Sequence, residues 1–570
     1  MKMLLKIGVF AISVSTAFAQ AEGSKGSTSF TIESGRSFAA SRGNATVTKP
    51  RETKTHLLAA SVVSDLAEAM SLIGKNHVDG AKTKTSAITS SSIDEMLRTL
   101  DPHSRYYDAK EFADLNGGHR SEYSGTGMYI ADYRVGSKDG VYVIAVGAGT
   151  SAETSGLKFG DKIISVEGRD VAGLNAAEVR GLVRGPNGTE LLVTVERADG
   201  TTKNNILLKR GRISNSSISD SFVDSNGVGY VGLRDGFSFS TAAEFGLAVA
   251  ELKGSGMQSL VIDLRGNGGG IFEQAVEIAE MFLGHGTHIV SQEGRTPAER
   301  QSWISENRSP ETMPVVVLVD RSTASAAEIL AGALQDNDRA LIVGERTFGK
   351  GLVQNVIELP NGSGLTLTAA RYYTPSGRSI QRNYSDEGLY DYFVGTNRGD
   401  LIASAENAFR TTTGRVVYGG DGIKPDREIV VSAPINSSNA LENFAFALIR
   451  EQMTSATQLQ IDELRRKILF GEDFISEELI NIATQRFPAM IGENKKRNAD
   501  ANRMDIRSNL AYYFALAAFD LRTANRVKIK DEVARIDLGL RVREAAELYA
   551  GSIQETKKAR RVTSQTGLNR

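Results

Sequence analysis

The spacing of apolar and polar residues predicts a β-rich module between residues 121 and 211. Short apolar runs separated by polar turns are typical of strands, and they occur here at residues 141–146, 161–166, 191–195 and 205–208. Asp199-Gly200 separates the last two runs and predicts a hairpin turn. Residues 176–183 have helical spacing.

From residue 212 to about 432 the pattern alternates between strands and helices. Continuous apolar runs predict buried strands at 259–264, 315–319 and 340–343, with helices between them at 271–283 and 325–335. Buried strands that alternate with helices indicate a parallel α/β arrangement.

The two flanking regions show helical spacing. Residues 56–70 and 92–100 predict helices of an N-terminal module (56–120), and Asp101-Pro102 ends the second helix. Residues 461–470 and 504–521 predict helices of a charged C-terminal region (433–570). This region carries no motif that we can interpret, so a dimerisation element (a homo-oligomer) and an adaptor surface both stay open.

Residues 1–19 predict a secretory signal peptide, because a basic start is followed by a short apolar run and an Ala-Phe-Ala site. The alternative is a buried or membrane-anchoring helix, but the run is shorter than the roughly 20 residues that span a bilayer. Residues 20–55 are rich in Ser, Thr and Gly and predict a flexible leader. We therefore expect an exported chain without a membrane span, in the periplasm or else extracellular or in the cell envelope.

The amino-acid composition excludes several kinds of functional site. The 570 residues include 67 Lys and Arg against 68 Asp and Glu, which gives no basic field for nucleic acid. The absence of cysteine excludes a thiol nucleophile and a thiolate zinc site. Six scattered histidines without an H-E-x-x-H pair predict no metal site, and we interpret them as surface or loop residues. No cofactor is expected.

Ser325 is the first candidate for chemistry. It lies in RSTASAAE (321–328), between a predicted strand and a predicted helix. A hydroxyl at a helix start can act beside unpaired N–H groups that stabilise a developing anion. The same residues also make a good helix cap, because Glu328 follows three positions later. Local sequence alone leaves both interpretations open.

Lys350 is the second candidate. GERTFGKG (344–351) nearly spells a phosphate-binding loop, but Gly351 replaces the magnesium-binding hydroxyl and a strand rather than a helix follows. An exposed strand-edge lysine is one interpretation. A desolvated lysine that acts as a general base is the other.

A glycine-rich turn, DLRGNGGG (263–270), is the third candidate. Ile271 breaks the G-x-G-x-x-G pattern of a dinucleotide site. Consecutive glycines instead allow backbone N–H groups to approach a substrate or an oxyanion closely.

Together these motifs resemble the carboxyl-terminal processing (tail-specific) proteases, which are serine peptidases with a Ser–Lys dyad. TASAAEI (323–329) and FGKGLVQ (348–354) resemble their active-site signature. LDPHS (100–104), SGLKFGD (155–161), VRGPNGT (183–189), RYYTPSGRSIQ (371–381) and GIKPD (422–426) resemble segments around it. The resemblance covers roughly residues 57–426, and the one departure in the signature is Ala327, where the family often has serine.

The resemblance implies roles for single residues. Ser325 would be the nucleophile, Lys350 its general base and Gln354 the residue that positions the lysine. The N–H groups of Ala326 and of one glycine in the 268–270 turn, Gly269, would form the oxyanion hole. Lys350 and Gln354 are four residues apart, about 13 Å in a straight strand, so their contact requires a bend or bulge.

The resemblance also implies that residues 121–211 form a PDZ domain. Its carboxylate-binding loop would contain Gly125, Gly127 and Met128, so that a peptide C-terminus adds to the sheet edge. A plain turn before a strand is the alternative.

We therefore expect a multidomain α/β protein. It would have a crotonase-like α/β protease core (212–432), an inserted β-rich PDZ domain (121–211), a helical N-terminal module and a helical C-terminal region. The function implied is an exported serine endopeptidase that recognises protein C-termini. The alternatives are a non-catalytic crotonase-like PDZ scaffold and a Ser-His-Asp hydrolase, which the absence of G-x-S-x-G at Ser325 disfavours.

Overall fold

The computed structural model describes residues 55–78, 85–119, 122–136, 138–214, 216–384, 392–393, 407–429, 438–487, 499–534 and 536–566. The predicted signal peptide and nearly all of the predicted leader lie outside these ranges. The chain divides into two units, Met1–Lys82 and Thr83–Arg570. Among the described residues, the first unit contains α1 (Thr55–Asn76), which the apolar spacing predicted. No helix in the described ranges combines the length and apolar character needed to cross a membrane.

The central sheet of the second unit is parallel, as predicted. Its strands are β10 (Asp220–Val223), β11 (Val228–Gly232), β12 (Ser259–Asp263), β15 (Val315–Val319), β16 (Leu341–Gly344) and β21 (Arg427–Glu428), in that order. Only the edge strand β10 runs antiparallel to its neighbour. The four strands β11, β12, β15 and β16 are buried along their whole length, because helices cover both faces of the sheet.

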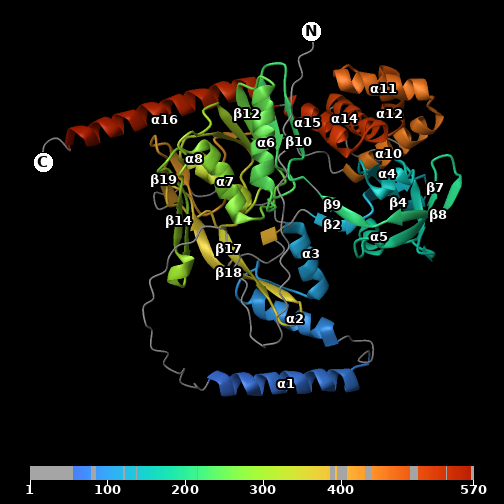
Figure 1. Ribbon diagram of the computed structural model, residues 1–570, viewed down its shortest axis with the longest axis horizontal. Helices are drawn as coiled ribbons and strands as arrows, with labels where there is room; N and C mark the ends of the chain where they lie inside the picture. The colour runs from blue at the N-terminus through green and yellow to red at the C-terminus, as the bar shows by residue number, and fades with distance from the viewer. Residues whose placement is uncertain are drawn as a thin grey trace, which may run out of the picture. The chain divides into compact units, whose positions relative to one another are not determined.

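Those helices form two layers. On one face lie α6 (Thr241–Gly254), α7 (Phe272–Phe282) and α8 (Ala326–Asp336), which share a large apolar core with the sheet. On the other face lie α15 (Leu521–Ala534) and the long α16 (Leu538–Thr566), which contribute Ile529 and Ala545 to a second core together with Ile536 of the connection between them (Figure 1). The C-terminal region is therefore part of the packing of the central sheet.

A second sheet of the same unit is antiparallel. It contains β1 (Arg105–Tyr107), β18 (Gly364–Tyr373), β13 (His288–Gly294) and β14 (Gln301–Ile304), with β17 (Leu352–Glu358) on the other edge of β18. The short helix η2 (Pro297–Glu299) joins β13 to β14. The small pair β19 (Ala408–Arg410) and β20 (Val416–Tyr418) lies apart from it.

The predicted N-terminal module differs from the structure in two ways. The division after Lys82 falls inside it, so that α2 (Thr85–Arg98) and α3 (Ala109–His119) belong to the second unit. It also contributes the strand β1, whose partner β18 lies more than 250 residues later in the chain. A three-residue strand shows no periodicity, so only the tertiary pairing reveals it.

The β-rich module has the predicted strands and helix. Its sheet has the order β3 (Met128–Val135), β4 (Lys138–Val146), β5 (Lys162–Val166), β7 (Glu190–Glu196) and β8 (Thr202–Lys209), with β6 (Arg169–Asp170) beside β5. The helices are α4 (Ser151–Thr154) and α5 (Ala176–Val183), and β2 (Glu122–Gly125) pairs with β9 (Gly211–Ser214) where the module begins and ends. β3 is therefore an edge strand.

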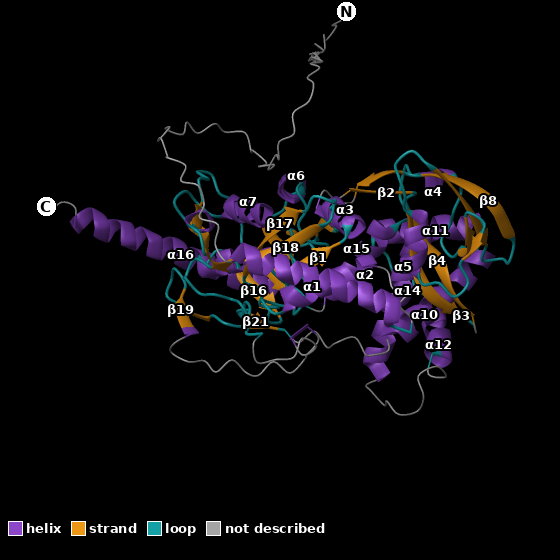
Figure 2. Ribbon diagram, turned by 90° about the horizontal axis from the view of Figure 1, so that it is seen from below, coloured by secondary structure: helices purple, strands orange, loops and turns teal. Residues whose placement is uncertain are grey.

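The remaining C-terminal helices are α10 (Ser438–Ser455), α11 (Gln458–Phe470), α12 (Glu477–Arg486) and α14 (Ala499–Ala518) (Figure 2). The helix predicted over 504–521 is α14, which ends at Ala518 before α15 begins at Leu521. The cause is Asp520, whose carboxylate accepts the N–H of Thr523 at 2.7 Å and so begins the next helix.

Candidate active site

Ser325 lies directly before α8, with a φ of +56° that is unusual for a residue with a side chain. Ser325 is the N-cap of α8 in a capping box: the carboxylate of Glu328 accepts the N–H of Ser325 at 2.9 Å, and the N–H of Glu328 is donated to the carbonyl oxygen of Ser325 at 2.8 Å. The helix-cap interpretation is therefore confirmed, and it does not exclude a chemical role for the hydroxyl. Strained backbone of this kind persists only where the surroundings enforce it, and it is frequent in active sites.

Glu328 joins the nucleophile candidate to the lysine loop. Its fully buried carboxylate accepts the N–H groups of Ser325 (2.9 Å), Lys350 (2.9 Å) and Gly349 (2.8 Å) and the hydroxyl of Thr347. Ser325 and Lys350 bond the same oxygen, Oε2, so their backbones lie side by side. Burial raises the pKa of Glu328 even though these donors oppose the change.

Tyr372 forms a second bridge between the same two residues. Its hydroxyl, on the buried face of β18, lies 3.0 Å from the carbonyl oxygen of Ser325 and 2.7 Å from that of Lys350. The bridging roles of Glu328 and Tyr372 could not be predicted from local sequence, since each residue lies far along the chain from one of its partners.

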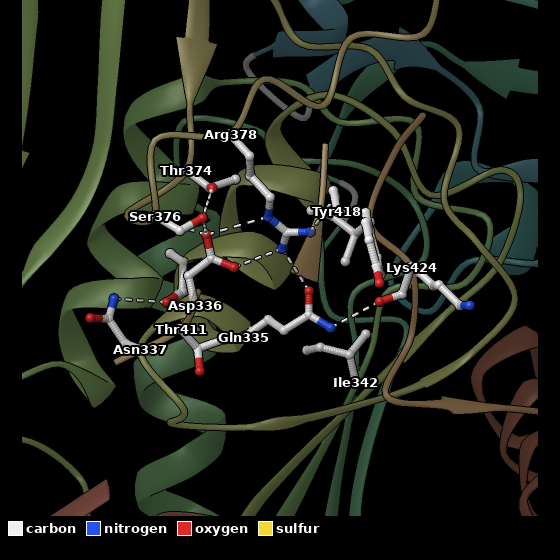
Figure 3. Close-up of polar contacts among 12 residues, drawn as sticks. Gln335, Asp336, Asn337, Ile342, Thr374, Ser376, Arg378, Thr411, Tyr418 and Lys424 are labelled. Carbon is white, nitrogen blue, oxygen red and sulfur yellow. Dashed lines mark hydrogen bonds and ion pairs between the residues drawn. The ribbon is translucent and has the colours of Figure 1, made fainter. Parts of the chain in front are cut away.

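The far end of α8 is anchored by a buried arginine (Figure 3). Arg378 is fully buried and donates to Asp336 and to Gln335 at 2.7 Å each, and to the carbonyl oxygen of Tyr418 at 2.8 Å. Asp336 also accepts the hydroxyl of Ser376 at 2.6 Å. A buried ion pair needs such added hydrogen bonds to offset desolvation. The helix that begins after Ser325 is thus fixed at both ends.

Lys350 contacts the glutamine that the resemblance assigns to it. Its Nζ donates to Oε1 of Gln354 at 2.8 Å, and Nε2 of Gln354 donates to the carbonyl oxygen of His103 at 2.7 Å. The pairing of β17 with β18 shifts register between Val353 and Gln354. This is the irregularity that the four-residue spacing required, although it lies at the glutamine rather than at the glycines beside the lysine.

Burial lowers the pKa of the Lys350 ammonium, because the charged form loses its hydration. The carboxylates of Asp101 and Glu328 oppose part of this change. The lysine therefore lies within the electrostatic influence of two carboxylates. Desolvation remains the larger effect.

His103 lies next to the lysine, in the loop that precedes β1. Burial and the positive charge of Lys350 lower the pKa of its ring to about 4, so that the imidazole is neutral near pH 7. The ring bonds the hydroxyl of Tyr392 at 2.8 Å and packs edge-on against Phe348 and Phe393. It is a loop residue, as predicted, but a half-buried one in contact with the site.

Asp101 shapes this loop. Its carboxylate accepts the N–H groups of His103 and Ser104 at 2.8 Å each and the hydroxyl of Ser104 at 2.7 Å. The LDPHS segment of the predicted N-terminal module is thus a wall of the site. The only sequence signal for this was the motif itself.

The glycine turn packs against Ser325. Gly269 has a φ of +99°, and a Cβ added there would lie 2.7 Å from the Cβ of Ser325 and 3.0 Å from the nitrogen of Ala326. Ala326 is the first residue of α8, where N–H groups have no partner within the helix. The N–H of Gly269, however, is donated to Oδ1 of Asn267 at 2.8 Å. Gly269 is therefore needed for close packing, but its N–H is already occupied.

The predicted carboxylate loop joins β2 to β3. Gly125 ends β2, Met128 begins β3, and Gly127 between them has a φ of +83°. A Cβ at Gly127 would clash with the side chain of Thr150. Beyond the loop, β3 has one free edge beside α5, where the exposed Arg180 donates to the carbonyl oxygen of Ile130 at 3.4 Å.

Two family models match the chain: Peptidase family S41 over residues 227–389 and PDZ domain over residues 142–197. The carboxyl-terminal-processing protease of Synechocystis is 35% identical over 300 residues, which cover 52% of this chain and 69% of that protein. This chain belongs to the carboxyl-terminal processing protease family.

Other members are similar over the same region. The carboxy-terminal processing protease CtpA of Bacillus subtilis is 33% identical over 303 residues, 53% of this chain and 63% of that protein. Among solved structures, the photosystem II D1 C-terminal processing protease aligns with 60% of this chain and 82% of that chain, at 32% identity and a TM-score of 0.32. The family matches span the PDZ domain and the region that contains Ser325 and Lys350.

The site offers no obvious place for a metal ion. Within the described ranges, no three His, Asp or Glu side chains gather in a way that could hold one. His285 and His288, which are three residues apart, have no third ligand near them in these ranges.

Proposed function

We propose that this chain is an exported serine endopeptidase that selects substrates by their C-termini and cleaves them with a Ser325–Lys350 dyad. The observation that carries the proposal is the double bridge of Glu328 and Tyr372. It holds the backbone of Ser325, at a helix start, close to the backbone of Lys350, whose amine is desolvated.

The chemistry follows from these positions. Neutral Lys350 takes the proton of the Ser325 hydroxyl while Oγ attacks the substrate carbonyl carbon. The N–H of Ala326 and one N–H of the 268–270 turn stabilise the resulting oxyanion. Since the N–H of Gly269 bonds Asn267, we assign the second donor to Gly268 or Gly270.

Collapse of the intermediate breaks the C–N bond. The Lys350 ammonium returns the proton to the leaving amine, and Ser325 remains acylated. Lys350, again neutral, then removes a proton from water while the water oxygen attacks the ester carbon. As the bond to Ser325 Oγ breaks, the Lys350 ammonium returns that proton to Oγ, and the new C-terminus is released as a carboxylic acid that ionises in water. Gln354 orients the amine throughout without adding negative charge that would retain the proton.

The PDZ domain supplies the recognition step in this proposal. PDZ domains capture a peptide C-terminus in backbone N–H groups and add it to a sheet edge. Gly125, Gly127 and Met128 precede the free edge of β3 and would bind the carboxylate. We further propose a crotonase-like core and export to the periplasm, which the signal-like residues 1–19 support.

Replacement of the nucleophile tests the proposal. Ser325→Ala should abolish hydrolysis of an unfolded reporter protein while the thermal midpoint stays that of the wild type. Ser322→Ala is a matched control, because Ser322 is an exposed serine in the same loop. Residual activity in Ser325→Ala above a few per cent of wild type would overturn the assignment, and an inactive wild type would favour the scaffold alternative.

A further inference from the structure

The C-terminal helices contact both domains that the proposed mechanism uses. We refer to α10, α14 and α15 together as the brace. α10 and α14 pack on the PDZ sheet, and α15 packs on the central sheet of the protease core. α14 and α15 are in extensive contact with each other, so the brace is continuous between the two domains.

At the PDZ end the contact is aromatic. Tyr133 of β3 stacks on Phe446 of α10, with ring centroids 4.0 Å apart and planes 11° apart. Its hydroxyl lies 2.9 Å from that of Tyr513 in α14. Arg450 of α10 also donates to the carbonyl oxygen of Gly160 at 2.7 Å. Stacked aromatics and a buried hydroxyl pair fix orientation, because both depend on geometry.

At the core end α15 is held by charge. Arg526 donates twice to the fully buried carboxylate of Asp220, at 2.7 and 2.9 Å. One turn and a half later, Glu532 contacts Arg234 and Arg265 at 3.3 Å each. Ile529 between them is buried against the sheet.

Arg265 is the link to the active site. Its guanidinium makes two bonds to the fully buried Asp263, at 2.9 and 2.7 Å, so that it is fixed in one orientation. Its side chain is nearly buried, and Glu532 is its second carboxylate partner. A shift of Glu532 would therefore move the guanidinium of Arg265 or leave it with Asp263 as its remaining carboxylate partner.

The residues on either side of Arg265 hold the approach to Ser325. The carbonyl oxygen of Leu264 accepts the hydroxyl of Thr323 at 2.8 Å, and that of Asn267 accepts the N–H of Ala324 at 2.9 Å. Thr323 and Ala324 immediately precede the nucleophile candidate. Asn267 also fixes Gly269 through its side chain.

We propose that the brace ties the PDZ domain to the loop that forms the oxyanion hole, and that Glu532 is the positioning residue at its catalytic end. The inference rests on the proposed function for its effect on turnover. It gives the C-terminal region a role in catalysis, and the dimerisation and adaptor roles stay open beside it.

The test compares two carboxylates on the same side of the sheet. Glu532→Gln removes the charge that faces Arg265. Glu544→Gln is the matched control, because Glu544 of α16 bonds Arg427 of β21 at 3.2 Å, at the opposite edge of the sheet from β10. Turnover of a peptide with a free C-terminus and hydrogen exchange of residues 264–271 are measured in full-length protein.

We expect Glu532→Gln to lower kcat about tenfold with KM unchanged, and to speed exchange in residues 264–271. Glu544→Gln should change neither. Tyr133→Phe, which removes only the hydroxyl at the PDZ end, should speed the same exchange by a smaller factor and tests the brace even if Glu532→Gln does not fold. Equal exchange in all three variants and the wild type would overturn the proposal. An inactive wild type would refute the proposed function alone, since exchange still reports on the brace.

Discussion

The polar groups around Ser325 and those along the free edge of β3 differ in their burial and in the number of hydrogen bonds that they make. Glu328 and Arg378 are fully buried and each makes at least three hydrogen bonds. Along β3, the exposed Arg180 of α5 donates one long bond of 3.4 Å to Ile130, and the N–H of Arg134 is donated to Asn443 at 2.6 Å. The first region is a closed network and the second is an open edge.

The difference matches what the proposed function requires of each region. A dyad needs its atoms held in one geometry and shielded from water, because desolvation lowers the pKa of the lysine and strengthens each hydrogen bond. A strand edge that receives a peptide must keep its N–H and C=O groups available. Substitutions should therefore act mainly on kcat in the first region and on KM in the second.

The largest effect should come from Lys350→Arg. A guanidinium stays protonated at any usable pH and cannot accept the serine proton. We expect kcat to fall about 10²–10⁴-fold or more, with the peptide affinity of the PDZ domain unchanged. Hydrolysis assays measure kcat, and calorimetry measures the peptide affinity of the PDZ domain. Activity near the wild-type level would refute the dyad.

Glu328→Gln should lower both stability and kcat. The amide has one acceptor oxygen for four donors and turns its own NH2 toward them, which we expect to cost about 1–3 kcal/mol of unfolding free energy. Chemical denaturation measures this loss. Glu345→Gln is the control, because its partner Arg321 is exposed and such pairs contribute about 0–1 kcal/mol. Equal losses in the two variants would show that Glu328 is not a buried bridge.

The pH dependence should follow Lys350. Its pKa is lowered by burial, so kcat/KM should rise with pH along a limb below the ordinary lysine value of about 10.4. The unfolded chain binds more protons across this window, so unfolding free energy should also rise with pH there. Gln354→Glu should move the limb to higher pH, because a carboxylate stabilises the ammonium.

His103→Gln is the control for the pH profile. The pKa of His103 is about 4 in the folded protein, so this ring stays neutral where the limb occurs. The limb should keep its position in this variant even if the rate falls modestly. A limb that disappears would assign the base to histidine and revive the Ser-His hydrolase alternative.

The smallest effect should come from Gly127→Ala, in the open region. The added Cβ would lie 2.3 Å from Thr150, and the φ of +83° disfavours a side chain. We expect KM for a substrate with a free C-terminus to rise about tenfold, which corresponds to about 1.4 kcal/mol, with kcat unchanged.

Gly181→Ala in α5 is the control, because no atom lies within 4 Å of the added Cβ. A C-terminally amidated substrate shows whether the lost affinity belongs to the carboxylate. If amidation has no effect on the wild-type enzyme, the loop does not bind C-termini.

Local pattern was enough to predict most elements. The helix at 176–183 has the predicted bounds. The strands predicted for the parallel sheet begin and end within a residue or two of their own predicted bounds. These segments are buried on one or both sides, so their apolar spacing is imposed by the fold and can be recognised in the chain. The residues proposed for the site, Ser325, Lys350 and Gln354, lie in short contiguous motifs, and such motifs can be recognised from the sequence alone.

The tertiary structure alone decided what surrounds those residues. Tyr372 and His103 lie in recognisable motifs, but their contacts with Ser325 and Gln354 join segments tens to hundreds of residues apart, and nothing in the neighbourhood of Glu532 marks its contact with Arg265. It also showed that the N–H of Gly269 is occupied. Hydrogen bonds between distant segments follow from how layers pack, whereas secondary structure follows from the spacing of apolar residues along each segment.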